Sequence, residues 1–171
     1  RVGTFPLKEP GRRDETRDMA VAAPLPRPIR RASAVAGIVA VALLLAGCLT
    51  PGQDSVLREL NADRRAYNRS NLPTHAQAQA KAQAWAEKLA REGRLYHSTL
   101  TAGITDNWCG LGENVGYGGT VAQIQDAYMA SAGHRDNVLN TSWNGVGVGY
   151  ATGKVNGVTV IFTVHSFIRT C

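Results

Sequence analysis

Four histidines and one carboxylate are the side chains that could do acid–base chemistry or hold a metal ion. The histidines are His75, His97, His134 and His165, and the carboxylate, Glu113, lies in a run rich in glycine. Glycines let the backbone adopt positive φ and let other groups approach closely. The run does not predict a phosphate cradle, because its spacing matches neither phosphate-binding fingerprint, no Lys-Ser/Thr pair follows, and Glu113 would repel phosphate.

Some of these polar residues have simple structural interpretations. His75 follows a proline in the loop between two predicted helices, so we expect it to be exposed to solvent. His165 falls in the last predicted strand, where a hydrogen-bonded core or edge histidine is expected. Ser98 beside His97 invites interpretation as a nucleophile, but adjacent residues of a strand point apart, and no nucleophile elbow is present. We therefore expect Ser98 to be structural.

Two helices are expected to precede Glu113. The first is capped by Asp54 or Ser55 and ends at residues 71–73. The second spans residues 76–92 and stops at Gly93. Alanines and Trp85 line one face of this second helix. The alanines allow close packing against another layer, with Trp85 in the core.

The remaining segments predict strands and a further helix. We expect a short strand at residues 115–117, a helix over residues 121–132 with Tyr128 inward, and strands around residues 146–150 and 158–167. Asn156-Gly157 between the last two strands predicts a hairpin turn. This order predicts an α+β sandwich with an antiparallel sheet.

Six motifs in this order resemble the CAP superfamily, which includes cysteine-rich secretory proteins, antigen 5 and plant pathogenesis-related proteins. Residues 54–167 carry the resemblance, and its Gly-His-Arg-x-Asn form is that of the bacterial branch. The motifs are Leu60-Asn61-Ala62-Asp63-Arg64, Ala84-Trp85-Ala86, His97-Ser98, Gly112-Glu113-Asn114-Val115, the run from Ser131 to Leu139, and Gly145-Val146-Gly147-Val148-Gly149.

The resemblance implies a three-layer α–β–α sandwich with a small, mainly antiparallel central sheet and an open polar cleft. In the family two histidines and two glutamates meet in this cleft. His97, Glu113 and His134 match three of the four positions. The helix before His134 contains no second glutamate, and Asp126 is shorter and lies several residues too early.

The resemblance also implies that His97, Glu113 and His134 could bind a divalent cation weakly, with zinc the best fit to two imidazoles and a carboxylate. Such a metal would lower the pKa of bound water to about 7. The alternative is a hydrogen-bonded His–Glu–His cluster without metal. Asn114, with Arg135 and Asn137, is expected to cap and brace the cleft, and Asn114 to line it.

The first 47 residues predict an export signal. Arg27, Arg30 and Arg31 precede the sixteen uncharged residues 32–47, a run somewhat shorter than the ~20 residues of a membrane span. It ends Leu45-Ala46-Gly47-Cys48, which resembles the lipobox of bacterial lipoproteins. The resemblance implies cleavage before Cys48, diacylation of its sulfur, and attachment to the outer face of the cell membrane; an uncleaved single-span anchor is the alternative.

These features divide the chain into four parts. Residues 1–18 form an unstructured extension or a start-site artefact ahead of Met19, residues 19–47 a lipoprotein signal peptide, residues 48–53 the acylated cysteine and a tether, and residues 54–171 the CAP domain.

The remaining cysteines are an even pair if Cys48 is lipidated. Outside the cytosol such a pair predicts a Cys109–Cys171 disulfide, whose loop would stabilise the fold by roughly 4 kcal/mol. Two unrelated buried thiols are the alternative.

Composition and charge restrict the class of protein. A chain of 171 residues that is 44% hydrophobic and 19% charged is neither disordered, collagen-like nor polytopic, and its length predicts one domain. Residues 1–47 hold eight Lys/Arg against four Asp/Glu, whereas residues 48–171 hold eleven against nine. The folded part therefore carries only +2, which argues against nucleic acid as a partner.

Three functions follow for an exported, membrane-anchored domain. The first is a non-enzymatic binding module that holds a lipid, glycan or protein partner of the envelope in the His/Glu cleft. The others are a structural envelope protein and a metal-assisted hydrolase of envelope peptides or esters.

Overall fold

The computed structural model describes residues 48–171. The predicted extension and signal peptide lie outside this range. Within residues 48–171 no helix is both long and apolar enough to cross a bilayer.

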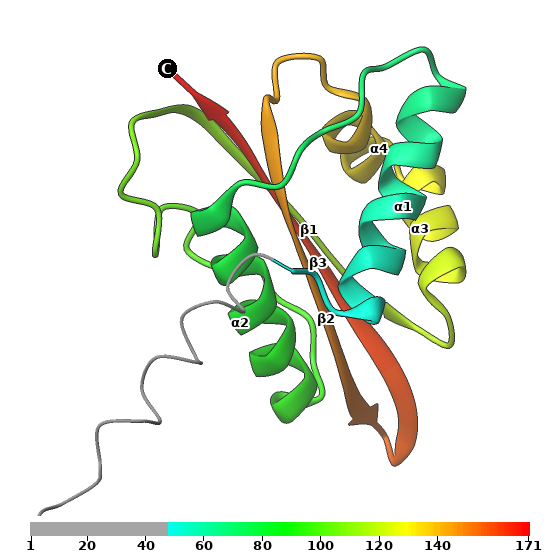
Figure 1. Cartoon of the computed structure of the whole chain (residues 1–171). Helices are drawn as coiled ribbons and strands as arrows, with labels where there is room; N and C mark the ends of the chain where they lie inside the picture. The colour runs from blue at the N-terminus through cyan, green and yellow to red at the C-terminus, as the bar shows by residue number, and fades with distance from the viewer. Residues whose placement is uncertain (1–47) are drawn as a thin grey trace, which may run out of the picture. The chain divides into compact units, whose positions relative to one another are not determined.

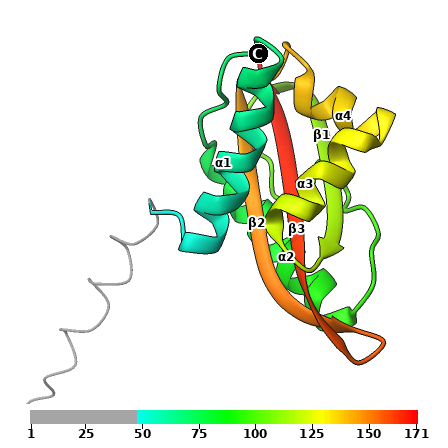
Figure 2. The same ribbon diagram turned by 90° about the vertical axis from the view of Figure 1, so that its right-hand side faces the viewer.

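The described chain forms a three-layer α–β–α sandwich, as the sequence predicts. Its elements are α1 (Pro51–Ala66), α2 (Ala76–Glu92), β1 (Trp108–Gly118), α3 (Val121–Ala130), α4 (Ala132–Leu139), β2 (Gly145–Val155) and β3 (Val158–Thr170). The strands form an antiparallel sheet in the order β1-β3-β2. Helix α2 covers one face of this sheet, and α1, α3 and α4 cover the other (Figures 1 and 2).

The two helical layers approach the sheet in different ways. Gly147 and Gly149 of β2 face α2, and a Cβ atom on either would overlap backbone atoms of that helix. The intervening residues Val146 and Val148 point to the opposite face, where they pack with Leu60 and other large side chains. Glycines and alanines therefore bring α2 close to the sheet, and bulky residues fill the other interface.

Several element boundaries differ from the sequence prediction; the first helix ends at Ala66 and not at residues 71–73, and β2 and β3 are longer than predicted. Helix α1 starts at Pro51, because Thr50 and Gln53 form a capping box and proline suits the first helical turn. The helix expected over residues 121–132 is two helices, since Ser131 adopts an extended conformation between α3 and α4. The predicted three-residue strand is the eleven-residue β1, whose glycines lowered its apparent strand propensity.

The hairpin prediction is confirmed. Asn156 and Gly157 have φ of 50° and 81°, the positive values that a two-residue turn between twisted strands requires. The disulfide prediction is also confirmed. Cys109 at the start of β1 is bonded to Cys171, across 62 residues, and ties the last residue of this chain to the strand that carries Glu113.

Candidate functional site

Neighbouring residues of β1 point to opposite faces of the sheet, and this alternation divides the predicted cleft. Val115 packs against α2, so Glu113, two residues away, points to the same side. Positions Gly112 and Gly116 face Asn137 of α4 and Tyr128 of α3. Asn114 lies between these two glycines and hydrogen-bonds to residues of α4.

The Glu113 carboxylate is the centre of the α2-side cluster. Its side chain is only 1% exposed. Oε1 lies 2.8 Å from Nδ1 of His97 and accepts a hydrogen bond of 2.9 Å from the backbone N–H of Ser98. Oε2 accepts a 2.6 Å hydrogen bond from the Ser98 hydroxyl. Hydrogen bonds to an ionised acceptor are stronger than neutral ones, so this carboxylate fixes the 97–98 segment against β1.

Lys81 of α2 completes this cluster, which we call the carboxylate cluster (Lys81, His97, Ser98 and Glu113). Its Nζ donates to Ser98 Oγ and to the Thr99 carbonyl, both at 2.7 Å. Desolvation lowers the pKa of Lys81, and the charge of Glu113 partly opposes this effect. The Ser98 hydroxyl thus accepts from an ammonium and donates to a carboxylate, which holds its proton in one orientation.

Ser98 has the structural contacts that the sequence predicted, although one reason given for the prediction was wrong. We expected His97 and Ser98 to point apart, yet both side chains contact Glu113. The segment is not a regular strand, so the alternation rule does not apply to it. Nothing in the sequence pointed to Lys81, because it lies 17 residues from Ser98 and no local motif links the two.

A second polar group lies on the other side of β1. The Asn114 side chain donates to the His134 carbonyl at 3.1 Å and accepts from the Asn137 side chain at 2.9 Å. Asn137 also lies 3.3 Å from the Glu113 carbonyl oxygen. These bonds are of the bracing kind expected for Asn114 and Asn137, and they attach the start of α4 to the strand. Arg135, expected to brace with them, donates to the Met129 carbonyl at 3.1 Å.

His134 does not share the hydrogen bonds of His97 and Glu113. Its Nδ1 lies 2.9 Å from Ser131 Oγ, and its ring lies 5.3 Å from that of Tyr128. Burial, and then repulsion by His97, lower its pKa. The structure therefore joins His97 to Glu113 directly, and His134 only influences the pair through space.

The arrangement does not fit the predicted three-ligand zinc site. Among residues 48–171 no group of three His, Cys, Asp or Glu side chains is placed to hold a metal ion. The Glu113 oxygens already accept the hydrogen bonds described above. We derive no chemistry through a metal at this site, and weak binding of a divalent cation stays a prediction.

His165 lies beneath the second polar group, in the centre of β3. It is completely buried, and within the described part of the chain neither ring nitrogen has a hydrogen-bond partner. The expectation of a hydrogen-bonded histidine is therefore wrong, because aromatic rings of Tyr128 and Phe167 surround it. Burial, followed by repulsion from His134, lowers its pKa to about 3, so it is neutral at physiological pH.

His75 also differs from its prediction. Its side chain is 20% exposed, and its Nε2 lies 3.1 Å from a carboxylate oxygen of Asp106. Its Nδ1 accepts a long, 3.5 Å hydrogen bond from the Ala78 N–H as the N-cap of α2. The capping position immediately before an alanine-rich helix was the available signal.

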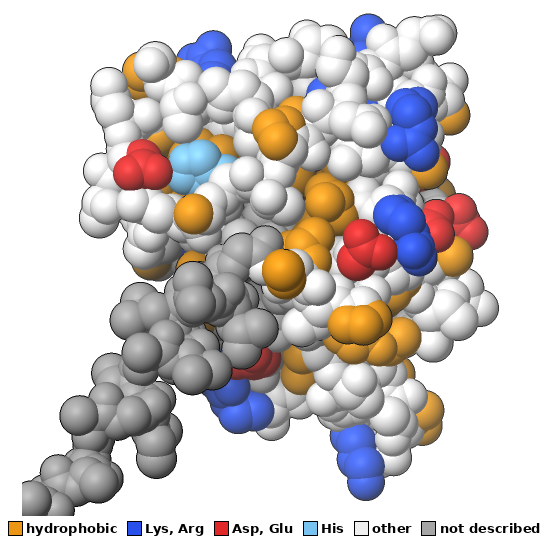
Figure 3. Space-filling view, viewed as in Figure 1, with side chains coloured by type: hydrophobic (Ala, Val, Ile, Leu, Met, Phe, Trp, Pro, Cys, Tyr) orange, Lys and Arg blue, Asp and Glu red, His pale blue; other side chains and the backbone are white. Residues whose placement is uncertain are grey.

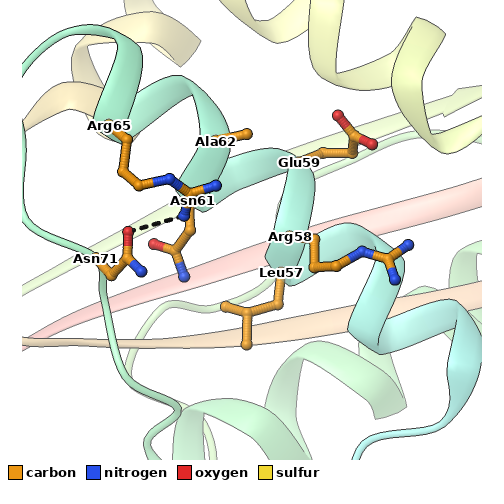
Figure 4. A pocket seen from close by; sticks show the side chains of 7 residues that line it. All are labelled: Leu57, Arg58, Glu59, Asn61, Ala62, Arg65 and Asn71. Carbon is orange, nitrogen blue, oxygen red and sulfur yellow. Dashed lines mark hydrogen bonds between the residues drawn. The ribbon is translucent and has the colours of Figure 1, made fainter.

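Several surface hollows lie on helices α1 and α2. A groove of about 590 Å³ runs along α2 and is also lined by Ser98 and Thr99, so it shares Lys81 and Ser98 with the carboxylate cluster. A smaller hollow of about 300 Å³ lies on α1, where Arg65 donates to Asn71 at 3.1 Å (Figure 4). On the face shown in Figure 3, the Lys and Arg side chains lie in separate places and form no continuous patch.

This fold and the order of its polar residues along the chain define a class of α–β–α sandwich domain. The sequence profile of the cysteine-rich secretory protein family, CAP, matches residues 57–166. The chain belongs to this family, as the motif order predicts. No curated protein matches it closely enough to add a function.

Solved structures of bacterial proteins share the fold. An extracellular protein with an SCP domain from Bacillus anthracis superposes with a TM-score of 0.55 at 24% identity, covering 72% of this chain and 45% of its own. An outer surface protein of Borrelia burgdorferi gives 0.53 at 19% identity, covering 68% and 92%. A cysteine-rich secretory protein of Staphylococcus aureus gives 0.52 at 18%, covering 70% and 39%. This chain thus spans less than half of the Bacillus protein.

Proposed function

We propose that this chain is an exported, lipid-anchored CAP protein that binds a lipid, glycan or protein of the cell envelope. Binding takes place around the carboxylate cluster and depends on His97 and Glu113, whereas Asn114 and His134, which the sequence also predicted for the cleft, have a structural role on the other side of β1. The protein acts as a binding module without chemistry of its own. Cys48 carries the anchor, on the outer face of the cell membrane.

The observation that carries this proposal is the set of contacts made by Glu113. A buried carboxylate with three hydrogen-bond partners is well suited to hold a loop in one conformation. The loop it holds forms a wall of the α2 groove through Ser98 and Thr99. Preorganised walls lower the entropic cost of binding.

Export is supported by two further observations. The Cys109–Cys171 disulfide is typical of proteins outside the cytosol. Solved relatives include an extracellular and an outer surface protein. For the anchor, Cys48 is exposed and lies two residues before the Thr50 cap of α1, so acylation would hold the domain close to the membrane.

The binding proposal is tested by recovery of envelope material with the full chain. The full chain is produced in a bacterial host, purified in mild detergent, and its bound lipids, glycans and proteins are measured. Glu113→Gln removes the charge but keeps the shape, and Glu87→Gln is the control because Glu87 is exposed on α2. We expect a bound component that is lost in Glu113→Gln and retained in Glu87→Gln. Equal recovery with both variants would overturn the proposal.

The anchor is tested by the mass of the native N-terminus. We expect a chain that begins at Cys48 with two acyl groups on a glycerol linked to its sulfur, and a Cys48→Ser variant that is neither acylated nor retained in the membrane fraction. An unmodified Cys48 in a chain that keeps residues 19–47 would contradict this part of the proposal.

A further inference from the structure

The α2 groove carries a row of basic side chains along one helical face. The groove-lining residues of α2 include Gln77, Lys81, Ala84, Lys88 and Arg91, whose spacing of four, three, four and three keeps them on one side of the helix. At 1.5 Å per residue, Lys81 and Lys88 are separated by about 10 Å along the axis, and Arg91 lies about 5 Å further. The row therefore extends over about three turns.

No acidic residue lines this groove. Three carboxylates lie near its ends, and all are engaged: Glu113 with the Ser98 hydroxyl below Lys81, Glu92 with Tyr96 and Arg94, and Asp106 with Gln77 and His75. Within residues 48–171 neither Lys88 nor Arg91 forms an ion pair with a carboxylate. These two cations give the groove an excess of positive charge.

The other lining groups combine an aromatic ring with small apolar side chains. Trp85 presents an aromatic ring, with Lys88 Nζ 4.7 Å from its centre. Thr99 adds a hydroxyl group, whereas the Ser98 hydroxyl and the Gln77 amide are hydrogen-bonded within the protein. Alanines line much of the rest of the groove. An open groove that combines this apolar surface and an aromatic ring with cations matches a ligand that has apolar patches, such as the faces of sugar rings, and negative charges.

The position of Lys81 favours a chain-like ligand over a flat membrane surface. Its ammonium group belongs to a half-buried side chain and is bonded to Ser98 and the Thr99 carbonyl, so a chain lying in the groove reaches it more readily than a planar bilayer does. The net charge of the folded part is only +2, which is small for a surface that binds nucleic acid.

We propose that the α2 groove binds an acidic glycan, a chain of sugars that carry carboxylates. Lys88 and Arg91 bind the carboxylates, Trp85 packs against a sugar ring, and the Ser98–Thr99 segment contacts sugar hydroxyls. This inference rests on the proposed binding function, because it names the ligand class for the groove that the carboxylate cluster shapes.

The test is a titration of the full chain, in mild detergent, with a hexamer of galacturonic acid, followed by calorimetry. A neutral hexamer of glucose is the matched probe. We expect the acidic hexamer to bind at least ten times more tightly than the neutral one, with affinity that falls as salt is raised.

Two variants locate the site. Lys88→Gln combined with Arg91→Gln should weaken binding of the acidic hexamer at least tenfold, and Lys88→Arg should retain it. Arg94→Gln is the control, because Arg94 is exposed and paired with Glu92 outside the groove. Unchanged melting temperatures establish that the variants are folded.

Three results would overturn the inference: equal affinity for the two hexamers, an undiminished affinity in the double variant, or binding to vesicles containing anionic phospholipid with none to the acidic hexamer. Failure of the broader proposal is distinguishable. If the hexamer does not bind but Glu113-dependent envelope material is still recovered, the glycan inference falls and the binding function stands. If that recovery also fails, both fall.

Discussion

The two faces of the sheet are built on different principles. Under α2, glycines of β2 and alanines of the helix bring two backbones into contact. Under α1, α3 and α4, large side chains such as Phe167 and Leu60 fill the space. The first interface fixes the position of one helix closely, and the second supplies most of the bulky apolar core.

This difference explains why the two polar groups differ. On the α2 side, a charged carboxylate is held by donors from a loop and is linked to the helix through Lys81. On the α4 side, neutral amides and imidazoles pack with aromatic rings. A rigid helix beside a fixed loop suits a binding groove, whereas the other side is largely structural.

The largest expected effect tests the close approach of α2. Gly147→Ala places a Cβ against backbone atoms of Ala78, which cannot move without the whole helix. We expect a loss of about 3 kcal/mol or more in the free energy of unfolding, measured with urea. Gly133→Ala is the control, because no atom lies within 4 Å of its added Cβ, and it should be neutral or slightly stabilising. Similar values for both would contradict the close-contact interface.

The next effect concerns the carboxylate cluster. Glu113→Ala leaves the Ser98 N–H and hydroxyl without their acceptor, so we expect a loss of about 3 kcal/mol in urea unfolding. Glu87→Ala removes an exposed carboxylate of α2 and should change stability by less than about 0.5 kcal/mol. Equal, small effects would mean that the cluster does not hold its loop.

A smaller effect is expected on the α4 side. Asn114→Ala removes one donor and one acceptor and leaves Asn137 with only its contact to the Glu113 carbonyl. We expect a loss of about 2 kcal/mol without a change in recovery of envelope material, measured by urea unfolding and by the binding assay above. Loss of binding at unchanged stability would move Asn114 from a structural role into the binding surface.

The acid sensitivity of the fold should originate on the α4 side. The pKa of His165 is about 3 in the folded protein against about 6.5 when unfolded. The unfolded chain therefore binds the proton more readily, and stability falls as the pH drops from about 6.5 towards 3, by up to ~1.4 kcal/mol per pH unit. The lowered pKa of His134 acts in the same direction.

His165→Leu sharpens this comparison. It removes two buried ring nitrogens without partners in the described residues, so stability at pH 7 should change by less than about 1 kcal/mol or increase. Its unfolding free energy should depend less on pH between 6.5 and 3. A pH dependence identical to that of the original chain, in urea unfolding at several pH values, would contradict the assignment.

Much of the fold was predictable from the sequence, because the signals were local. The helix over residues 76–92 with its Gly93 stop, the Asn156-Gly157 turn and the cysteine pair all correspond to the structure. The full length of β1 was hidden, because a strand with four glycines lacks the β-branched residues that mark strands. The break between α3 and α4 at Ser131 was hidden because a serine residue does not by itself end a helix.

The site was predictable only in part. The family resemblance selected His97, Glu113 and His134, and the structure joins the first two. His134 lies apart from this pair because side chains alternate between the two faces along the whole of β1. The sequence predicted a strand of only three residues there, so this alternation at Glu113 could not be foreseen. Lys81 and the unpartnered His165 depend on contacts between distant segments, which spacing along the chain does not reveal.

Hydrogen exchange of the Ser98 amide tests the central claim most directly, since its N–H donates to the buried Glu113 carboxylate and is the backbone link between loop and strand. Amide exchange followed by NMR should show Ser98 protected in the original chain and exposed in Glu113→Ala, which removes the acceptor, while amides of β3 keep their protection in both. Rapid exchange of the Ser98 amide in the original chain would contradict the account.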